Sequence, residues 1–282
     1  MAKAQALVIG INKVDPKHYD GWDGFLAVCE NDAKDFSSYL KTKKLKSITT
    51  LLTKSASRDV VKKGLENAAK NLVKGDLFVV YYSGHGGNEI PDINGDDHDG
   101  FDETWCLFDG ELLDDELLLA WRKFKAGVRI VVVSDSCFSG DIVKFNPLRL
   151  KIEKTKAMPP QVGMATYKKN KSFYDAVAES VKDADLKEEK KTGGFKTKVK
   201  ATVLQISSSQ EWQPSIPETD DFPKNSLFTG VMMKEIKENK KMKTFTDLIK
   251  QTKKKMPVYQ TPKHQVIGSK NIPILSNGIF KI

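Results

Sequence analysis

The chain has 282 residues, of which 39% are hydrophobic and 29% are charged, a composition typical of a globular protein that can bury a core. Its apolar runs are far shorter than the ~18 residues needed to cross a bilayer, and its first residues lack a signal-peptide layout, so we expect a cytoplasmic protein with no membrane partner. Three widely spaced cysteines, Cys29, Cys106 and Cys137, with no CxxC spacing, indicate neither a disulfide framework nor a zinc site.

The net charge of +9 is concentrated in the second half of the chain. Residues 1–140 carry 18 Lys and Arg against 22 Asp and Glu, a net −4, whereas residues 141–282 carry 28 against 15, a net +13. The lysines of 144–200 are mixed with acids and lack the interleaved aromatic residues typical of a nucleic-acid surface. We therefore expect a solvated lysine-rich segment and no nucleic-acid partner; steeply salt-dependent binding would contradict this.

Predicted strands and helices alternate along the first half of the chain. In chain order, apolar runs and helical spacings indicate strand 4–12, helix 25–43, strand 47–53, helix 57–73, strand 76–86, strand 103–109, helix 114–125 and strand 128–137. This alternation is typical of an α/β protein with a mainly parallel sheet covered by helices on both faces.

The regular pattern stops after residue 144 and returns near residue 200. There it predicts a strand at 201–209, helices near 226–240 and 244–256, and a closing strand at 258–268. We expect one domain over 1–282, made of a first part, 1–144, a flexible lysine-rich insertion over about 145–198, and a second part, 199–282. So long an irregular stretch inside a domain is typical of processing or regulation.

Two predicted strands end in a reactive side chain. The strand at 76–86 leads to His85 and the strand at 128–137 leads to Cys137. Because the carboxyl ends of parallel strands lie at one edge of a sheet, these residues are expected to form a dyad, with Cys137 as nucleophile and His85 as base and acid. The backbone amides of Gly86 and Cys137 could form an oxyanion hole. Cys29 and Cys106 lie in apolar patterns that indicate packing.

The two strand ends also carry a family resemblance. The segments FVVYYSGHGG (78–87) and IVVVSDSCFSG (130–140) closely resemble the His and Cys motifs of caspase-like cysteine peptidases. The signature of true caspases is absent, and the DSCFSG sequence looks instead like the metacaspase and orthocaspase branch. A later segment, LQISSSQEWQPSIPE (204–218), is similar to the family's substrate-binding segment. The resemblance implies a caspase-like α/β/α sandwich and a cysteine endopeptidase; an inactive caspase-like scaffold or signalling module is the alternative.

The same resemblance implies a substrate pocket for a cation. Asp32, Ser83 and Asp135 match the positions with which metacaspase-like enzymes hold an Arg or Lys before the cleaved bond. A pair of carboxylates would bind either side chain through charge-assisted hydrogen bonds. By itself, Asp32 could equally be an exposed acid at the start of a helix. The expected partners are protein or peptide substrates with Arg or Lys at that position, and we expect a monomer.

An acidic, glycine-containing stretch over 92–117 is a candidate calcium site, since Ca²⁺ prefers oxygen ligands. The resemblance to metacaspases implies Asp102, Asp114 and Asp115 as ligands, whereas the family's fourth acid falls on Lys144. A solvated loop at Asp102 and a helix cap at Asp114 and Asp115 explain these residues equally well. Calcium is therefore an expected cofactor only by resemblance.

The insertion offers the enzyme its own substrate. Cleavage after Arg or Lys inside 145–200 would give two fragments joined by a shared sheet, and candidate positions include Arg149, Lys151, Lys169, Lys191 and Lys200. A surface insertion that is never cut is the alternative.

Overall fold

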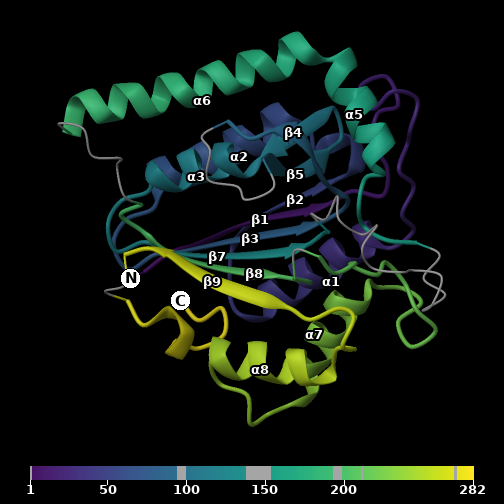
Figure 1. Cartoon of the computed structure of the whole chain (residues 1–282). Coiled ribbons are helices and arrows are strands. Elements are labelled where there is room, and N and C mark those ends of the chain that lie inside the picture. Colours follow the sequence, from purple (N-terminus) through teal and green to yellow (C-terminus); the bar gives the residue numbers. More distant parts are fainter. Residues whose placement is uncertain (1, 94–99, 138–153, 193–198, 211, 270–271) are drawn as a thin grey trace.

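A six-stranded sheet forms the centre of the molecule (Figure 1). The computed structural model describes residues 2–93, 100–137, 154–192, 199–210, 212–269 and 272–282. The strand order is β2-β1-β3-β7-β8-β9, and every neighbouring pair is parallel except β8 and β9. The strands are β1 (Ala4–Gly10), β2 (Ser47–Leu52), β3 (Leu77–Ser83), β7 (Arg129–Asp135), β8 (Thr202–Ser207) and β9 (Lys263–Gly268).

Helices cover both faces of this sheet. On one face α1 (Cys29–Thr42), α7 (Leu227–Glu238) and α8 (Phe245–Lys255) pack against alternate strand residues in one apolar cluster. On the other face lie α2 (Arg58–Asn71) and α3 (Asp114–Arg122). The central strands β3 and β7 are buried from both sides, which explains their nearly continuous apolar sequences. The predicted α/β/α sandwich with a mainly parallel sheet is confirmed.

A small antiparallel sheet lies on the side of α2 and α3 (Figure 1). It contains β4 (Gly86–Pro91), β5 (Phe101–Leu107) and β6 (Gly110–Leu113). The sequence predicted only the middle strand. Its neighbour β4, with the sequence GGNEIP, has no alternation of apolar residues, so no local pattern could predict it.

Two helices occupy much of the segment for which an irregular insertion was expected. They are α5 (Pro160–Lys169) and α6 (Lys171–Thr192), which lies over α3 (Figure 1). Tyr174 and Val181, seven residues apart on α6, are buried against Ile90 and Leu113 of the small sheet. This apolar contact is what orders a lysine-rich sequence as helix, and polar residues around it had hidden the helical spacing.

Short elements and surface features complete the description. Two 3₁₀ turns span Thr53–Ser55 and Ile274–Ser276.

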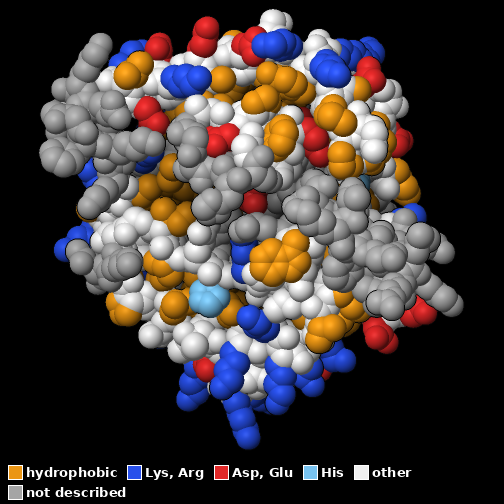
Figure 2. Space-filling view, viewed as in Figure 1, with side chains coloured by type: hydrophobic (Ala, Val, Ile, Leu, Met, Phe, Trp, Pro, Cys, Tyr) orange, Lys and Arg blue, Asp and Glu red, His pale blue; other side chains and the backbone are white. Residues whose placement is uncertain are grey.

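Lys and Arg side chains gather at the bottom of Figure 2, over α8, whose last turn contains Lys253, Lys254 and Lys255. Within the described residues, every helix is too short or too polar to cross a membrane.

We expect Gly10→Ala to destabilise the fold. A Cβ at Gly10 would meet the carbonyl oxygen of Cys29 and would lie 2.7 Å from the Cβ of Ala33, because α1 crosses β1 closely there. The predicted loss is ~1–3 kcal/mol in the free energy of unfolding, measured by urea denaturation. Gly64→Ala is the control, since its Cβ would meet only the Leu7 side chain at 3.2 Å and alanine favours the helix by about 1 kcal/mol. Equal unfolding midpoints for the two variants would contradict this packing account.

Candidate active site

His85 and Cys137 lie beyond the ends of two adjacent parallel strands. The last paired residues of β3 and β7 are Ser83 and Asp135, which are opposite each other in the sheet. His85 and Cys137 each follow two residues later, and they are 6% and 0% exposed. The register of the sheet therefore brings both side chains to the same edge, as the sequence predicted.

The hydrogen bonding of His85 defines which ring nitrogen can accept a proton. Nε2 lies 2.9 Å from the carbonyl oxygen of Gly24, and a carbonyl can only accept, so Nε2 carries the hydrogen. Nδ1 is buried and, apart from the nearby backbone of Ala157, has no hydrogen-bond partner among the described residues. Burial lowers the pKa of His85 to about 4; the backbone of Gly24 and of Ala157 opposes this shift, and the charge of Lys156 adds to it. The ring is thus neutral near pH 7, with Nδ1 as its basic atom.

Cys137 follows β7 at this edge of the sheet, whereas Cys29, the first residue of α1, is buried beside Ser83 of the pocket. The Cys137 thiol donates to the carbonyl oxygen of Gln213, at 3.1 Å. Burial raises the pKa of Cys29 to about 12 and that of Cys106 well above its ordinary value, so both remain thiols. Their role is packing, which leaves Cys137 as the candidate nucleophile.

The three residues predicted to bind a substrate cation form one pocket beside the dyad. Asp32 comes from α1, Ser83 from the end of β3 and Asp135 from the end of β7, and all three are fully buried. Ser83 Oγ donates to Asp32 Oδ2 at 2.8 Å. The interpretation of Asp32 as an exposed helix-start acid is therefore wrong, because α1 turns this carboxylate toward the sheet.

Residues from the second part of the chain hold the two carboxylates in place. The backbone amide of Ser226 donates to Asp32 at 2.9 Å, and the Ser226 hydroxyl donates to the same carboxylate. Asp135 accepts from the hydroxyls of Ser215, at 2.9 Å, and Thr229, at 2.6 Å. Sequence reasoning missed these donors individually, although Ser215 lies in the segment that resembles the family's substrate-binding region.

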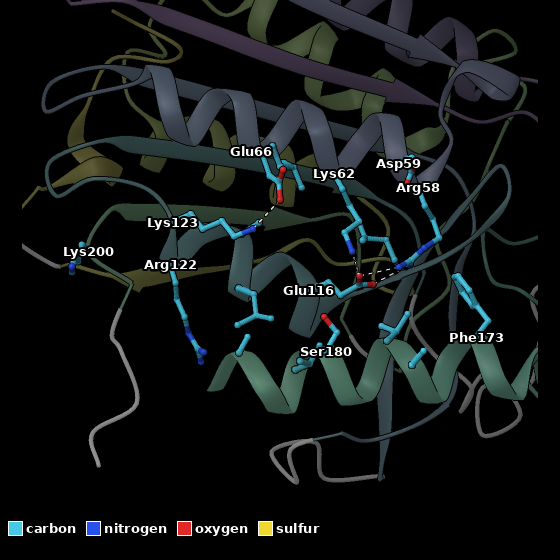
Figure 3. A pocket seen from close by; sticks show the side chains of 18 residues that line it. Arg58, Asp59, Lys62, Glu66, Glu116, Arg122, Lys123, Phe173, Ser180 and Lys200 are labelled. Atoms are coloured by element: carbon cyan, nitrogen blue, oxygen red, sulfur yellow. Dashed lines mark hydrogen bonds and ion pairs between the residues drawn. The ribbon is translucent and has the colours of Figure 1, made fainter. Parts of the chain in front are cut away.

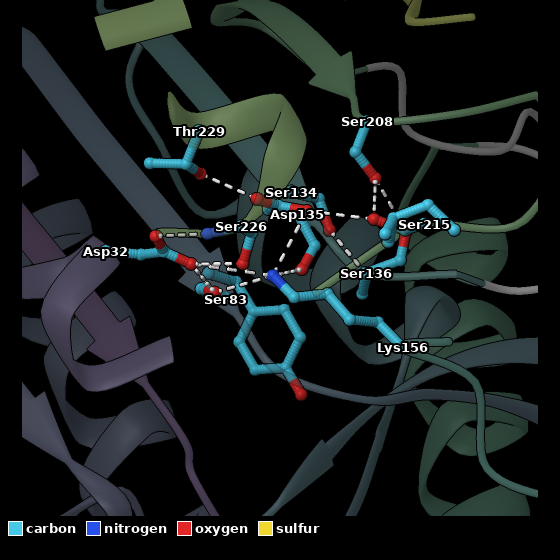
Figure 4. Close-up of polar contacts among 12 residues, drawn as sticks. Asp32, Ser83, Ser134, Asp135, Ser136, Lys156, Ser208, Ser215, Ser226 and Thr229 are labelled. Atoms are coloured by element: carbon cyan, nitrogen blue, oxygen red, sulfur yellow. Dashed lines mark hydrogen bonds and ion pairs between the residues drawn. The ribbon is translucent and has the colours of Figure 1, made fainter. Parts of the chain in front are cut away.

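The pocket is filled by a lysine of the chain itself (Figure 4). Lys156 is 0% exposed, and its Nζ lies 3.1 Å from Asp135 Oδ1 and 3.6 Å from Asp32 Oδ2. Nζ also donates to Ser83 Oγ at 2.8 Å and to the Asp135 carbonyl at 3.1 Å. Burial disfavours this ammonium, but the carboxylates outweigh burial and raise its pKa. Burial also raises the pKa of Asp32, to about 6, against the lowering effect of Lys156.

The backbone of Lys156 lies across the dyad. Its carbonyl oxygen accepts from the amides of Gly86, at 3.0 Å, and Cys137, at 3.1 Å, the pair predicted to form an oxyanion hole. Its amide donates to the Ser215 carbonyl at 2.8 Å, and Met158 donates to the Gly86 carbonyl at 2.7 Å. Ala157 pairs with Gly86 in a parallel bridge. The segment is thus bound on both sides of the Lys156 carbonyl as an extended peptide.

The residues predicted to bind calcium lie in the small sheet and at the start of α3. Asp102 is on β5 and is 1% exposed, Asp115 is 5% exposed, and Asp114 is exposed. Among the described residues, no three His, Cys, Asp or Glu side chains are grouped closely enough to hold a metal ion. Lys144, where the family's fourth ligand falls, lies outside the described residues, and the calcium site stays a prediction.

A cavity of about 750 Å³ lies away from this site, between α2, α3 and α6 (Figure 3). Several of its basic side chains form ion pairs. Glu116 accepts from Arg58 at 2.9 Å and from Lys62 at 2.7 Å, and Lys123 lies 3.0 Å from Glu66. Five basic residues and three acidic residues line the cavity, so its lining has an excess of positive charge.

Comparison with known proteins identifies the family. The family described as Caspase domain matches residues 3–281. The chain belongs to the caspase domain family. The match confirms the predicted resemblance to caspase-like cysteine peptidases.

The caspase-domain relatives agree with this placement in sequence and in structure. Metacaspase-1A of Aspergillus fumigatus is 36% identical over 152 residues, 49% of this chain and 35% of its own length. Metacaspase-1 of Pyricularia oryzae is 33% identical over 153 residues, 37% of its length. This chain spans about a third of the length of these relatives. A crystal structure of a Geobacter sulfurreducens protein, 39% identical, covers 99% of both chains with a TM-score of 0.83. Caspase-1 of Spodoptera frugiperda shares the fold, with a TM-score of 0.53 at 10% identity over 99% of this chain and 90% of its own.

We predict that His85 stays neutral well below pH 6 while Lys156 fills the pocket. In a Cys137→Ala chain, NMR titration of the imidazole should give a pKa near 4, because the ring is buried beside a cation. Lys156→Gln in the same background should raise this pKa by removing the positive charge. His85→Ala assigns the resonance. A pKa near the ordinary 6.5 in both proteins would contradict the described environment.

Proposed function

We propose that this protein is a cysteine endopeptidase that cleaves peptide bonds after Lys or Arg. The observation that carries the proposal is Lys156, whose side chain fills the acidic pocket while its carbonyl accepts hydrogen bonds from the amides of Gly86 and Cys137. A peptide substrate with a lysine before the cleaved bond would make the same contacts. Family membership supports the class of reaction.

The proposed mechanism uses Cys137 and His85 as a dyad. The Cys137 thiol leaves its hydrogen bond to Gln213, gives its proton to Nδ1 of His85 and attacks the substrate carbonyl. The amides of Gly86 and Cys137 then face the developing negative charge on the carbonyl oxygen. Because His85 is neutral beforehand, it can accept this proton and later donate it to the leaving nitrogen.

The charge of the pocket accounts for the proposed specificity. A lysine ammonium has three donors, and three acceptor atoms surround Nζ within 3.1 Å: Ser83 Oγ, the Asp135 carbonyl and Asp135 Oδ1. The whole group is shielded from water, so a substrate aspartate would add a third buried carboxylate beside Asp32 and Asp135. An arginine carries the required charge and could bind a carboxylate through two hydrogen bonds.

The alternative of an inactive scaffold or signalling module fits the geometry less well. A scaffold has no need for two amides that converge on a single carbonyl oxygen, or for a neutral imidazole at the adjacent strand end. Calcium stimulation, implied by resemblance through Asp102, Asp114 and Asp115, stays a separate proposal, tested by running the assays below with and without Ca²⁺.

Removal of the dyad should abolish catalysis without unfolding the protein. Cys137→Ala removes the nucleophile and should leave no activity on fluorogenic Lys peptides, and His85→Ala should lower kcat by several orders of magnitude. Circular dichroism and urea midpoints check that both variants fold. Full activity in purified Cys137→Ala would disprove the mechanism.

Loss of one pocket charge should reduce catalysis on cationic substrates. We expect Asp135→Asn to lower kcat/KM for Lys and Arg peptides about 100-fold or more, since only one of the two pocket carboxylates would remain to compensate the charge of the substrate. The peptides should differ only in the residue before the cleaved bond, which is Lys, Arg, Gln or Asp. Asp59→Asn, on the exposed surface of α2, is the matched control and should leave kcat/KM unchanged. Cleavage after Asp, with none after Lys or Arg, would refute the proposed specificity.

A further inference from the structure

The loop between β1 and α1 packs an aromatic side chain against His85. The ring centroids of Trp22 and His85 lie 4.7 Å apart, and the two ring planes are tilted by 58°. Two residues after Trp22, the Gly24 carbonyl accepts from His85 Nε2 at 2.9 Å. One short loop therefore contacts the imidazole twice, once at a ring nitrogen and once with an indole.

The hydrogen bond to Gly24 cannot fix the imidazole by itself. Nε2 lies close to the axis of the Cβ–Cγ bond, so a half-turn about this bond moves Nε2 little but exchanges Nδ1 with the carbon Cδ2. Torsions of this kind have broad, roughly two-fold preferences, so packing against the ring has to select one orientation. Among the described residues, Trp22 is the one aromatic side chain in ring contact with His85.

We propose that Trp22 is a positioning residue, which keeps the His85 ring in the orientation that bonds Nε2 to Gly24 and leaves Nδ1 for the proton of Cys137. Trp22 would act through the imidazole, because a base must be held in place before the thiol reacts. This inference rests on the proposed function, since it concerns the base of the same dyad.

Trp22 is held in turn by its own loop and by the core. Tyr19 packs against the indole edge-on, with ring centroids 6.1 Å apart, and the Trp22 amide donates to the Tyr19 carbonyl at 3.0 Å. Tyr19 is 0% exposed, and its hydroxyl donates to the carbonyl of Leu107 on β5 at 2.7 Å. The packing of the core therefore fixes where the indole lies.

Gly24 leaves room for the indole beside the imidazole. Its φ of +53° lies in the left-handed region that favours glycine. A Cβ at this position would lie 2.7 Å from the Trp22 ring, closer than two carbon atoms can approach. The tryptophan and the glycine thus depend on each other, and together they allow the indole and the carbonyl to reach His85.

Steady-state kinetics on a fluorogenic Lys peptide test the role of Trp22 in catalysis. We expect Trp22→Ala to lower kcat about 10- to 100-fold and to change KM less than about threefold, because the cation pocket stays intact. Trp22→Phe keeps an aromatic ring and should retain kcat within about threefold. Phe25→Ala is the matched control, since Phe25 lies in the same loop with its side chain 59% exposed, and it should leave kcat unchanged.

Urea midpoints check that each variant is folded in the assay. Trp22→Leu, which keeps apolar bulk without an aromatic ring, replaces Trp22→Ala if the alanine variant is unfolded.

NMR of the imidazole tests the contact independently of catalysis. In a Cys137→Ala chain, Trp22→Ala should expose the His85 ring to water and raise its pKa from about 4 toward the ordinary 6.5. The charge of Lys156, which also acts on this ring, is the same in both chains. Loss of the indole ring current should also move the resonances of the His85 ring protons. Trp22→Phe should keep the pKa near that of the parent chain.

The two measurements separate failure of this inference from failure of the proposed function. If wild type turns over the peptide and Trp22→Ala keeps its kcat or changes only KM, the inference alone is overturned. It is also overturned if Trp22→Phe is as slow as Trp22→Ala, or if the His85 pKa and resonances do not move. If they move as expected but wild type turns over no peptide, the positioning contact stands and the endopeptidase function fails.

Discussion

A buried ammonium held between two buried carboxylates is the interaction around which the site is built. Asp32, Asp135 and Lys156 are all inaccessible to water, and each charge would be costly without the others. One positive charge does not neutralise two negative ones, so neutral donors complete the pocket: the hydroxyls of Ser83, Ser215, Ser226 and Thr229 and the amide of Ser226. These donors come from strands, loops and helices of both parts of the chain, and the pocket therefore requires the whole fold.

The parallel sheet explains why catalysis and specificity share one edge. Ser83 and Asp135 are paired at the last register position of β3 and β7, and each strand then continues by two residues into His85 and Cys137. The pocket residue and the reactive residue of each strand are thus fixed by the same backbone. The amides of Gly86 and Cys137 bind the carbonyl oxygen of Lys156 while its ammonium fills the pocket, so one residue is held at both groups.

The segment after Lys156 adds two helices, α5 and α6, beside the small sheet. From Met158 onward it follows the small sheet and then forms α5 and α6, whose apolar residues cover β4 and the start of α3. A single stretch of chain therefore fills the pocket at one end and is anchored by packing at the other.

The sequence by itself determined the parts that local patterns encode. Runs of β-branched residues ending in Ser and Gly placed His85 and Cys137 at strand ends, and the family resemblance placed Asp32, Ser83 and Asp135 in a pocket that the fold does assemble. Only the tertiary structure decided which of the 46 lysines and arginines fills this pocket, and which hydroxyls hold its carboxylates. Lys156 has no local feature that separates it from Lys154, and β4 and α6 are ordered by apolar partners distant in sequence. The partners of this buried ion pair are distant in sequence. The packing of the whole domain brings them together, and no short stretch of residues can predict the pairing.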